Sequence, residues 1–250
     1  MELLKHGEHA TLELDPAGVA RVTMCHEESR NALGEAMVRA LEGALDEAEA
    51  WPALKAVVLL GLPEMFSSGA DPSLLARLVD GSLSPTEILL PRRLFAVPVP
   101  VIAAMEGHAI GGGFALGVSA DLVVAARESR YGANFTDLGF TPGMGTTRLL
   151  EHVMTPALAH ELLYTGELRR GAALEGRAFN AVLPRREVRA HALRMAARIA
   201  EKPRPTLELL HQTLTLPRRQ AFEASLTTES MMHRLSFREP EVRARLREFS

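Results

Sequence analysis

Two residue types are nearly absent from this sequence. Cys25 is the only cysteine, so an internal disulfide is impossible and a cysteine-based metal cluster is excluded. Lysine occurs only at Lys5, Lys55 and Lys202, and arginines make up the other 25 of the 28 basic residues. This scarcity removes most candidates for a catalytic or phosphate-binding lysine.

Long apolar runs are also missing. No stretch of 18 apolar residues occurs, and the first residues carry charges where a secretion signal needs an apolar core. Net charge is −3, and no basic stripe with interleaved aromatic residues is present, which argues against a nucleic-acid partner. We therefore expect a cytoplasmic protein without a membrane segment. The hydrophobic fraction of 47% still predicts one sizeable core.

Apolar patterning predicts an α/β fold with largely parallel strands. Short apolar runs, or alternating apolar and polar residues, predict strands, and apolar residues at helical spacing predict the helices between them. The expected strands are residues 11–14, 19–24, 56–60, 99–104 and 121–126, and the expected helices are residues 34–50 and 111–119.

The pattern changes near residue 187. Residues 186–200, 203–214 and 218–237 have helical patterns, and Pro217 is expected to separate the last two. We therefore divide the chain into an α/β core (1–187) and a C-terminal helical region (188–250).

Two glycine-rich segments follow predicted strands. They are residues 66–71 (FSSGAD) and residues 107–113 (GHAIGGG). Glycines let a backbone approach a ligand closely, and two converging loops would supply two N–H donors to one oxygen, forming an oxyanion hole. A tight turn with helix packing is the alternative for the GGG run alone. Neither segment forms a dinucleotide-binding GxGxxG, and Ser67 and Ser68 lack a serine-hydrolase elbow.

Four ordered motifs extend this interpretation: residues 30–33 (RNAL), 67–71 (SSGAD), 100–125 and 131–150. Together they resemble the crotonase (enoyl-CoA hydratase/isomerase) superfamily over roughly residues 10–187. The resemblance implies a spiral of ββα units whose C-terminal helices mediate homotrimers. It also implies that the N–H groups of Ala70 and Gly112 bind the thioester carbonyl oxygen.

The two glutamates of hydratases are missing at the matching positions. Ala115 and Phe135 stand there, and neither can transfer a proton. Phe114, Ala115 and Phe135 instead predict an apolar pocket that contacts the substrate. Loss of carbon dioxide suits such a pocket, because a carboxylate is destabilised away from water and the oxyanion hole holds the resulting enolate.

Residues 134–145, 182–188, 200–210 and 229–233 resemble one crotonase subgroup, the decarboxylases of polyketide β-branching cassettes. That resemblance implies conversion of a 3-methylglutaconyl thioester on an acyl carrier protein to a 3-methylcrotonyl thioester. It also implies that His233 donates the proton, and Glu229, one turn earlier, is expected to orient the imidazole and raise its pKa. A surface histidine paired with a glutamate is the alternative on spacing alone.

Ser84 stands where the subgroup usually carries a lysine. Arg77, Arg92 or Arg93 could bind the departing carboxylate or dock an acidic carrier protein, although each also fits a solvated helix position. The missing lysine leaves open whether the proton goes to the γ carbon, giving a conjugated product, or to the α carbon. No cofactor is expected beyond the phosphopantetheine of a carrier protein or of coenzyme A.

Other polar residues near the motifs have structural alternatives. His108 is expected to form a structural hydrogen bond and Asp71 to fix the shape of its loop, whereas Asn134 either binds substrate or closes a turn. Two other functions remain open. One is a coenzyme A-dependent isomerase or hydratase that recruits Asp137 or His233, and the other is a catalytically silent subunit that binds carrier protein.

Overall fold

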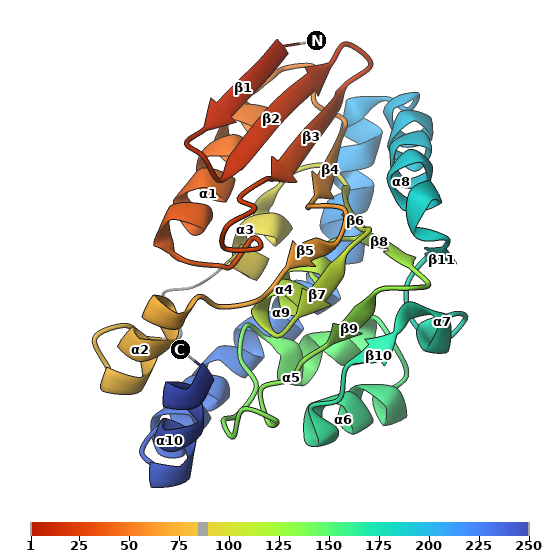
Figure 1. Ribbon diagram of the computed structural model, residues 1–250. Coiled ribbons are helices and arrows are strands. Elements are labelled where there is room, and N and C mark those ends of the chain that lie inside the picture. The colour runs from red at the N-terminus through yellow and green to blue at the C-terminus, as the bar shows by residue number, and fades with distance from the viewer. Residues whose placement is uncertain (1, 85–89, 250) are drawn as a thin grey trace.

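A seven-stranded sheet forms one half of the molecule in the computed structural model, which describes residues 2–84 and 90–249 (Figure 1). Its two N-terminal strand pairs are antiparallel and the four pairs that follow are parallel, as the sequence predicted. In spatial order the strands are β1 (Glu2–His6), β2 (Ala10–Asp15), β3 (Val19–Met24), β4 (Ala56–Leu60), β6 (Val101–Met105), β8 (Leu122–Ala126) and β11 (Ala181–Leu183).

Both faces of this sheet are covered by helices. Val57 and Leu59 of β4 pack into the core under α1 (Glu35–Ala50), whereas Val58 and its neighbours pack against α8 (Arg185–Ala200). Successive side chains of a strand point to opposite faces, so a strand buried on both sides has a continuous apolar sequence. Helix α8 fits closely because small residues recur every four positions: Ala192, Ala196 and Ala200.

A second sheet of four short strands carries the loops of interest. In spatial order its strands are β10 (Arg169–Arg170), β9 (Arg130–Gly132), β7 (His108–Ile110) and β5 (Met65–Ser67). The pairs β5–β7 and β7–β9 are parallel, so the carboxyl ends of β5 and β7 lie at one edge. Strands of two or three residues have no periodicity to detect, and the sequence did not reveal them.

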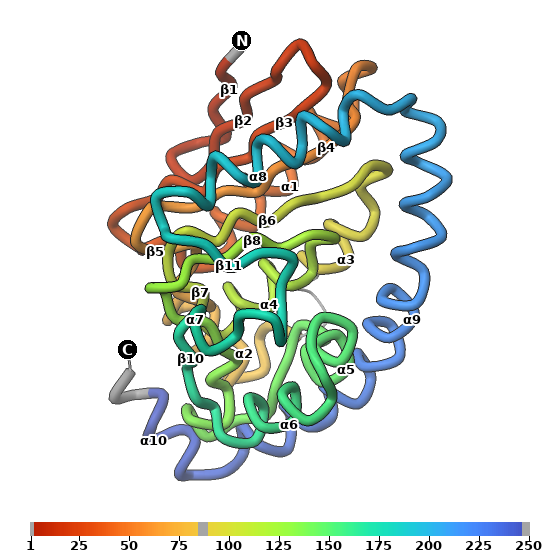
Figure 2. Tube along the Cα trace, turned by 90° about the vertical axis from the view of Figure 1, so that its right-hand side faces the viewer, coloured from red at the N-terminus to blue at the C-terminus, as the bar shows by residue number. Residues whose placement is uncertain are grey.

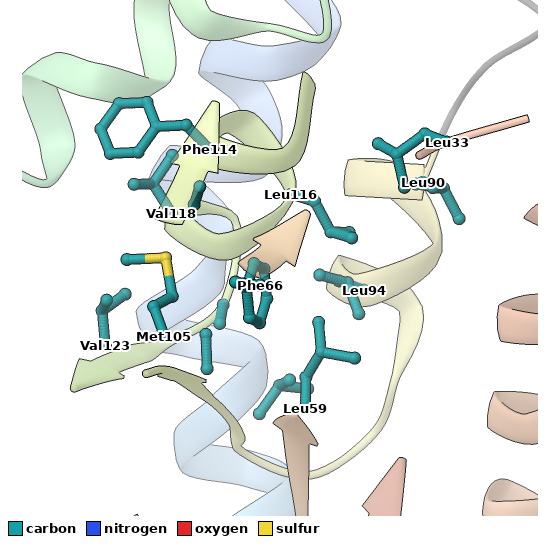
Figure 3. Close-up of a cluster of buried hydrophobic side chains, with 14 of the residues drawn as sticks. Leu33, Leu59, Phe66, Leu90, Leu94, Met105, Phe114, Leu116, Val118 and Val123 are labelled. Atoms are coloured by element: carbon teal, nitrogen blue, oxygen red, sulfur yellow. The ribbon is translucent and has the colours of Figure 1, made fainter. Parts of the chain in front are cut away.

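Helix α4 (Gly112–Val118) is buried against β5 (Figure 3). The Phe66 side chain of β5 packs among Leu94, Leu59 and Leu116 in this cluster. Glycine makes the close approach possible, because a Cβ atom on Gly113 would lie 2.5 Å from the carbonyl oxygen of Ser67. The start of α4 is thereby fixed beside the end of β5.

The remaining helices surround this centre (Figure 2). They are α2 (Pro72–Asp80), α3 (Leu90–Ala96), α5 (Thr146–Leu149), a 3-10 turn (Leu150–His152), α6 (Pro156–Thr165), α7 (Gly171–Leu174), α9 (Arg204–Ser236) and α10 (Pro240–Phe249). Within the two described segments, no helix combines the length and the apolar character needed to cross a bilayer.

Helix α9 corrects one prediction, since it continues through Pro217 for 33 residues. Contacts on both sides of the proline hold it. His211 Nε2 lies 3.0 Å from one carboxylate oxygen of Asp121, and Arg218 donates to the other at 2.5 Å. A proline removes one helical hydrogen bond, and these anchors compensate for it.

Candidate active site

Two backbone amides meet where β5 and β7 end. The loop after β5 carries Ala70, and α4 begins at Gly112 directly after β7. Gly69 (φ +96°) and Gly111 (φ +53°) adopt backbone conformations that favour glycine, which turns the following amide groups away from the sheet. A Cβ atom on Gly112 would lie 3.8 Å from the amide nitrogen of Ala70, so the two N–H groups are close neighbours.

Neither amide is used by the fold. No hydrogen bond joins the N–H of Ala70 or Gly112 to an acceptor in residues 2–84 or 90–249. The neighbouring groups are paired, since Leu33 donates to the Gly69 carbonyl oxygen at 2.6 Å and Gly111 donates to that of Gly132 at 2.9 Å. Two adjacent unpaired donors are what an oxyanion hole requires.

These amides open into a cavity of about 80 Å³. Its wall is mostly apolar. The contributing apolar side chains are Leu33, Leu74, Leu75, Leu78, Ile110, Phe135, Leu138, Phe140 and Met144. Ser68 and Asn134 add polar groups, and His233 is the only titratable side chain among the described residues of the lining. His233 is therefore the candidate for proton transfer inside the cavity.

The His233 side chain is 5% exposed and held from three sides. Its Nε2–H donates to the Thr141 carbonyl oxygen at 2.7 Å, and its ring stacks on Phe237 and contacts Phe140 at centroid distances of 5.2 and 6.0 Å. Nδ1 is buried with no hydrogen-bond partner in the described part of the chain. Burial lowers the pKa of His233, against the smaller raising effect of the Thr141 carbonyl. Near neutral pH, Nδ1 therefore carries no proton and has a free lone pair.

Glu229 does not orient His233, which corrects the prediction from their spacing. Its carboxylate accepts hydrogen bonds from the Gly145 N–H (2.8 Å), the Thr147 N–H (3.0 Å) and the Thr147 hydroxyl (2.5 Å). Burial raises the pKa of Glu229, and these three donors oppose the rise. Glu229 therefore fixes the segment around Gly145, and the pKa of His233 is lowered rather than raised.

The cavity brings together most of the predicted site residues. Ala70, Gly112, Asn134, Phe135 and His233 all line it.

Phe114 and Ala115 do not line it, contrary to the sequence-based expectation. Both are fully buried in α4, and the Phe114 ring packs edge-on against Phe179 in the core. Ser84 lies in an adjacent opening that shares Leu78 and His233 with the cavity.

Three other polar residues have structural roles or lie elsewhere. His108 Nδ1 accepts from the Arg130 N–H at 2.8 Å, as expected for a structural histidine. Asp71 caps α2 by accepting from the Leu74 N–H at 2.7 Å, which confirms its role in loop shape. Asp137 is exposed and outside the cavity lining, so its carboxylate is not placed to replace a hydratase glutamate.

The three arginines suggested for anion binding are engaged in ion pairs. Arg77 pairs with Glu35, and Arg92 pairs with Glu223. Arg93 pairs with Asp46 and Glu49. Sequence reasoning missed the Thr141 carbonyl and the Phe237 ring around His233, because a backbone acceptor and a helix-end aromatic have no sequence signal.

Comparison with known proteins agrees with this geometry. Residues 15–250 match the enoyl-CoA hydratase/isomerase family. The chain is 37% identical to the bacillaene synthase decarboxylase PksI of Bacillus subtilis, with 98% of each chain covered.

Two solved structures are similar along the whole chain. One belongs to a dehydratase/decarboxylase enzyme couple involved in polyketide β-branching (TM-score 0.94, 36% identity, 100% of both chains covered). The other is the ECH2 decarboxylase domain of CurF from Lyngbya majuscula (TM-score 0.90, 34% identity, 98% of this chain and 100% of that chain). The predicted crotonase fold is confirmed, and the chain belongs to the enoyl-CoA hydratase/isomerase family.

Proposed function

We propose that this protein decarboxylates a 3-methylglutaconyl-type thioester carried on an acyl carrier protein, as a step of polyketide β-branching. Two of its relatives are decarboxylases, and a third relative comes from a dehydratase/decarboxylase couple. The observation that carries the proposal is chemical. The cavity combines two unpaired amide donors with one titratable group, and the hydratase positions hold Ala115 and Phe135.

Bond cleavage needs no base in this site. The bond between the carboxylate carbon and the γ carbon breaks, carbon dioxide leaves, and the electron pair passes through the double bond to the thioester oxygen. The amides of Ala70 and Gly112 donate to that oxygen as its charge develops, which lowers the barrier. The apolar wall keeps water from the carboxylate and favours its loss.

His233 supplies the one proton that the reaction consumes. Because Nε2–H is committed to the Thr141 carbonyl, the transferred proton is on Nδ1. The neutral imidazole of the free enzyme gains that proton when the substrate carboxylate arrives, since a nearby negative charge raises a histidine pKa. Phe237, which stacks on the imidazole, stabilises the cation through its ring face. Transfer to the γ carbon gives the conjugated 3-methylcrotonyl product, and transfer to the α carbon gives the β,γ-alkene.

The substrate is delivered on phosphopantetheine, and no other cofactor takes part in the proposed chemistry. The residues after the first glycine loop are Pro72 and Ser73, without the lysine that would favour the nucleotide of coenzyme A. A homotrimer completes the proposal. Exposed leucines of α9 support self-association, since Leu209, Leu210 and Leu214 are 69%, 54% and 65% exposed.

The test is to incubate the enzyme with 3-methylglutaconyl-acyl carrier protein and weigh the carrier by mass spectrometry. Loss of carbon dioxide with wild type, and not with His233→Ala, is the expected result. NMR of the released acyl group then shows the position of the double bond.

An unchanged carrier mass with wild type would contradict the proposal. Binding without turnover would then indicate a silent carrier-binding subunit, and a moved double bond at constant mass would indicate an isomerase.

A further inference from the structure

A second opening lies beside the reaction cavity, between α2 and the junction of α9 with α10. Leu78 and His233 line both, so the two spaces are adjacent and the proposed proton donor lies between them. Ser84 lies on the α2 side of this opening, and Arg234, Arg238 and Arg243 contribute on the opposite side.

The charge of this opening is unbalanced. Asp80 is the only acidic side chain among its described lining residues, and it accepts from the Ser82 N–H at 2.8 Å. Arg234, Arg238 and Arg243 form no ion pair with any acid in the described ranges, and Arg243 Nε donates to the Phe237 carbonyl oxygen at 3.0 Å.

An anionic ligand would balance this excess of positive charge. The proposed substrate is such a ligand, because it bears a free carboxylate beyond its thioester. Inside the reaction cavity the two amide groups donate to the thioester oxygen, and His233 is neutral in the free enzyme. The cavity itself therefore supplies no cation for the carboxylate. The guanidinium groups of the opening lie around a space that shares Leu78 and His233 with that cavity, and guanidinium binds carboxylate through paired hydrogen bonds.

We propose that Arg234 and Arg238, supported by Arg243, bind the free carboxylate of the substrate and bring it to His233. This inference rests on the proposed function and names the cation that Ser84 does not provide. Both Arg234 and Arg238 are exposed at the opening, so they contribute to capture of the substrate. The carboxylate loses its charge as carbon dioxide forms, so a guanidinium group bound to it stabilises the bound substrate more than the transition state. Such binding lowers KM and does not raise kcat.

A carboxylate has two rivals as the bound anion: the phosphate of phosphopantetheine and the acidic surface of a carrier protein. A pantetheine thioester removes both rivals, because it has neither phosphate nor protein. The test therefore uses 3-methylglutaconyl-pantetheine as substrate and 3-methylcrotonyl-pantetheine as a ligand without the carboxylate.

The variant is Arg234→Gln with Arg238→Gln, and Arg194→Gln with Arg198→Gln on the exposed side of α8 gives the same charge change away from the opening. We expect KM for the glutaconyl thioester to rise about tenfold, as the loss of a charged hydrogen bond implies. The expected kcat does not fall, because the lost contact favours the bound substrate over the transition state. Inhibition by the crotonyl thioester should not change, and Arg234→Lys with Arg238→Lys should restore part of the affinity.

An unchanged KM would overturn the inference, and so would equal weakening of both ligands. A KM effect seen only with the carrier-bound or phosphorylated substrate would assign the arginines to one of the rivals instead. If wild type releases no carbon dioxide, the proposed function fails on its own. Calorimetric binding of the glutaconyl thioester to wild type and to the double variant then still decides whether the arginines bind its carboxylate.

Discussion

A Cβ atom placed on Gly143 would lie 2.6 Å from Cε1 of His233 and 3.1 Å from its Nε2. The imidazole cannot move aside cheaply, because Phe237 and Phe140 pack on it and Thr141 accepts its Nε2–H. The position of the proposed acid therefore depends on the absence of a side chain at residue 143.

Replacing Gly143 with alanine should displace His233 and remove most of its proton transfer. We expect kcat for carbon dioxide release to fall by about 10²-fold or more, which is the usual contribution of a positioned acid. Gly43→Ala, in a helix that contributes nothing to the cavity lining, is the control. Full activity of Gly143→Ala, with a melting temperature like that of wild type, would show that His233 is not the donor.

The pH dependence should separate the free enzyme from the bound complex. Burial lowers the pKa of His233 below its ordinary value of 6.5, and the reaction consumes a proton. Since kcat/KM reports the free enzyme, it should decrease as pH rises through the neutral range, by up to about tenfold per unit. The bound carboxylate raises the histidine pKa, so kcat should stay level to a higher pH.

Rates measured between about pH 5.5 and 8.5 test this. A kcat/KM that does not depend on pH, or the same slope in His233→Gln, would contradict the assignment of the proton to His233.

The oxyanion hole can be blocked without removing its donors. A Cβ atom on Gly112 would lie 3.8 Å from the Ala70 nitrogen and 3.0 Å from Sδ of Met144, a side chain flexible enough to move. We expect Gly112→Ala to fold and to lose about 10²-fold in kcat, because the methyl group stands beside both amide donors and hinders the approach of the thioester oxygen. Its residual activity should keep the wild-type pH profile, since His233 is untouched. A variant with unchanged kcat would place the oxyanion elsewhere.

Glu229 should affect both stability and rate. In Glu229→Gln, the new amide NH2 is a donor that meets a donor of Gly145 or Thr147, so one buried hydrogen bond is lost. We therefore expect the free energy of unfolding to fall by about 1–3 kcal/mol. The loosened segment includes Gly143, so kcat should fall as well. Glu223→Gln breaks only an exposed pair with Arg92 and should change stability by less than about 0.5 kcal/mol. Denaturant titrations of both variants provide the comparison.

Self-association should depend on the exposed leucines of α9. Leu210→Glu with Leu214→Glu places charges on that face, and we expect sedimentation to show a monomer where wild type sediments as a trimer. Tyr164→Glu changes an apolar side chain that is 85% exposed on α6 and should leave the assembly intact. A wild-type monomer, or an assembled double variant, would contradict the proposed interface.

Much of the fold was predictable because its strands are apolar and its turns use glycine. The continuous run of β4 and the alternation of β2 and β3 gave their boundaries within one or two residues. The second sheet was not predictable, since β5, β7 and β9 contain three residues each. Pro217 was misinterpreted because tertiary contacts hold its helix. Asp121, directly before β8, binds His211 and Arg218 on the two sides of the proline.

The candidate site was predictable where motifs carry it. Ala70, Gly112 and His233 follow from the glycine loops and the family resemblance, and the cavity brings them together. Glu229 shows the limit of spacing arguments. Residues four apart on a helix are neighbours, yet Glu229 is bonded to Gly145 and Thr147 of another segment. Which partner a buried carboxylate takes depends on packing that no local pattern encodes.

The replacement of both hydratase glutamates has a consequence for the product. A 3-methylcrotonyl thioester is itself an α,β-unsaturated acyl group, the kind of compound to which hydratases add water. Ala115 is buried in α4, and Phe135 lines the cavity with an apolar side chain, so neither position can activate a water molecule. The α,β double bond that γ-protonation of the dienolate restores therefore leaves a site that cannot rehydrate it, and the absence of those two carboxylates preserves the unsaturated product.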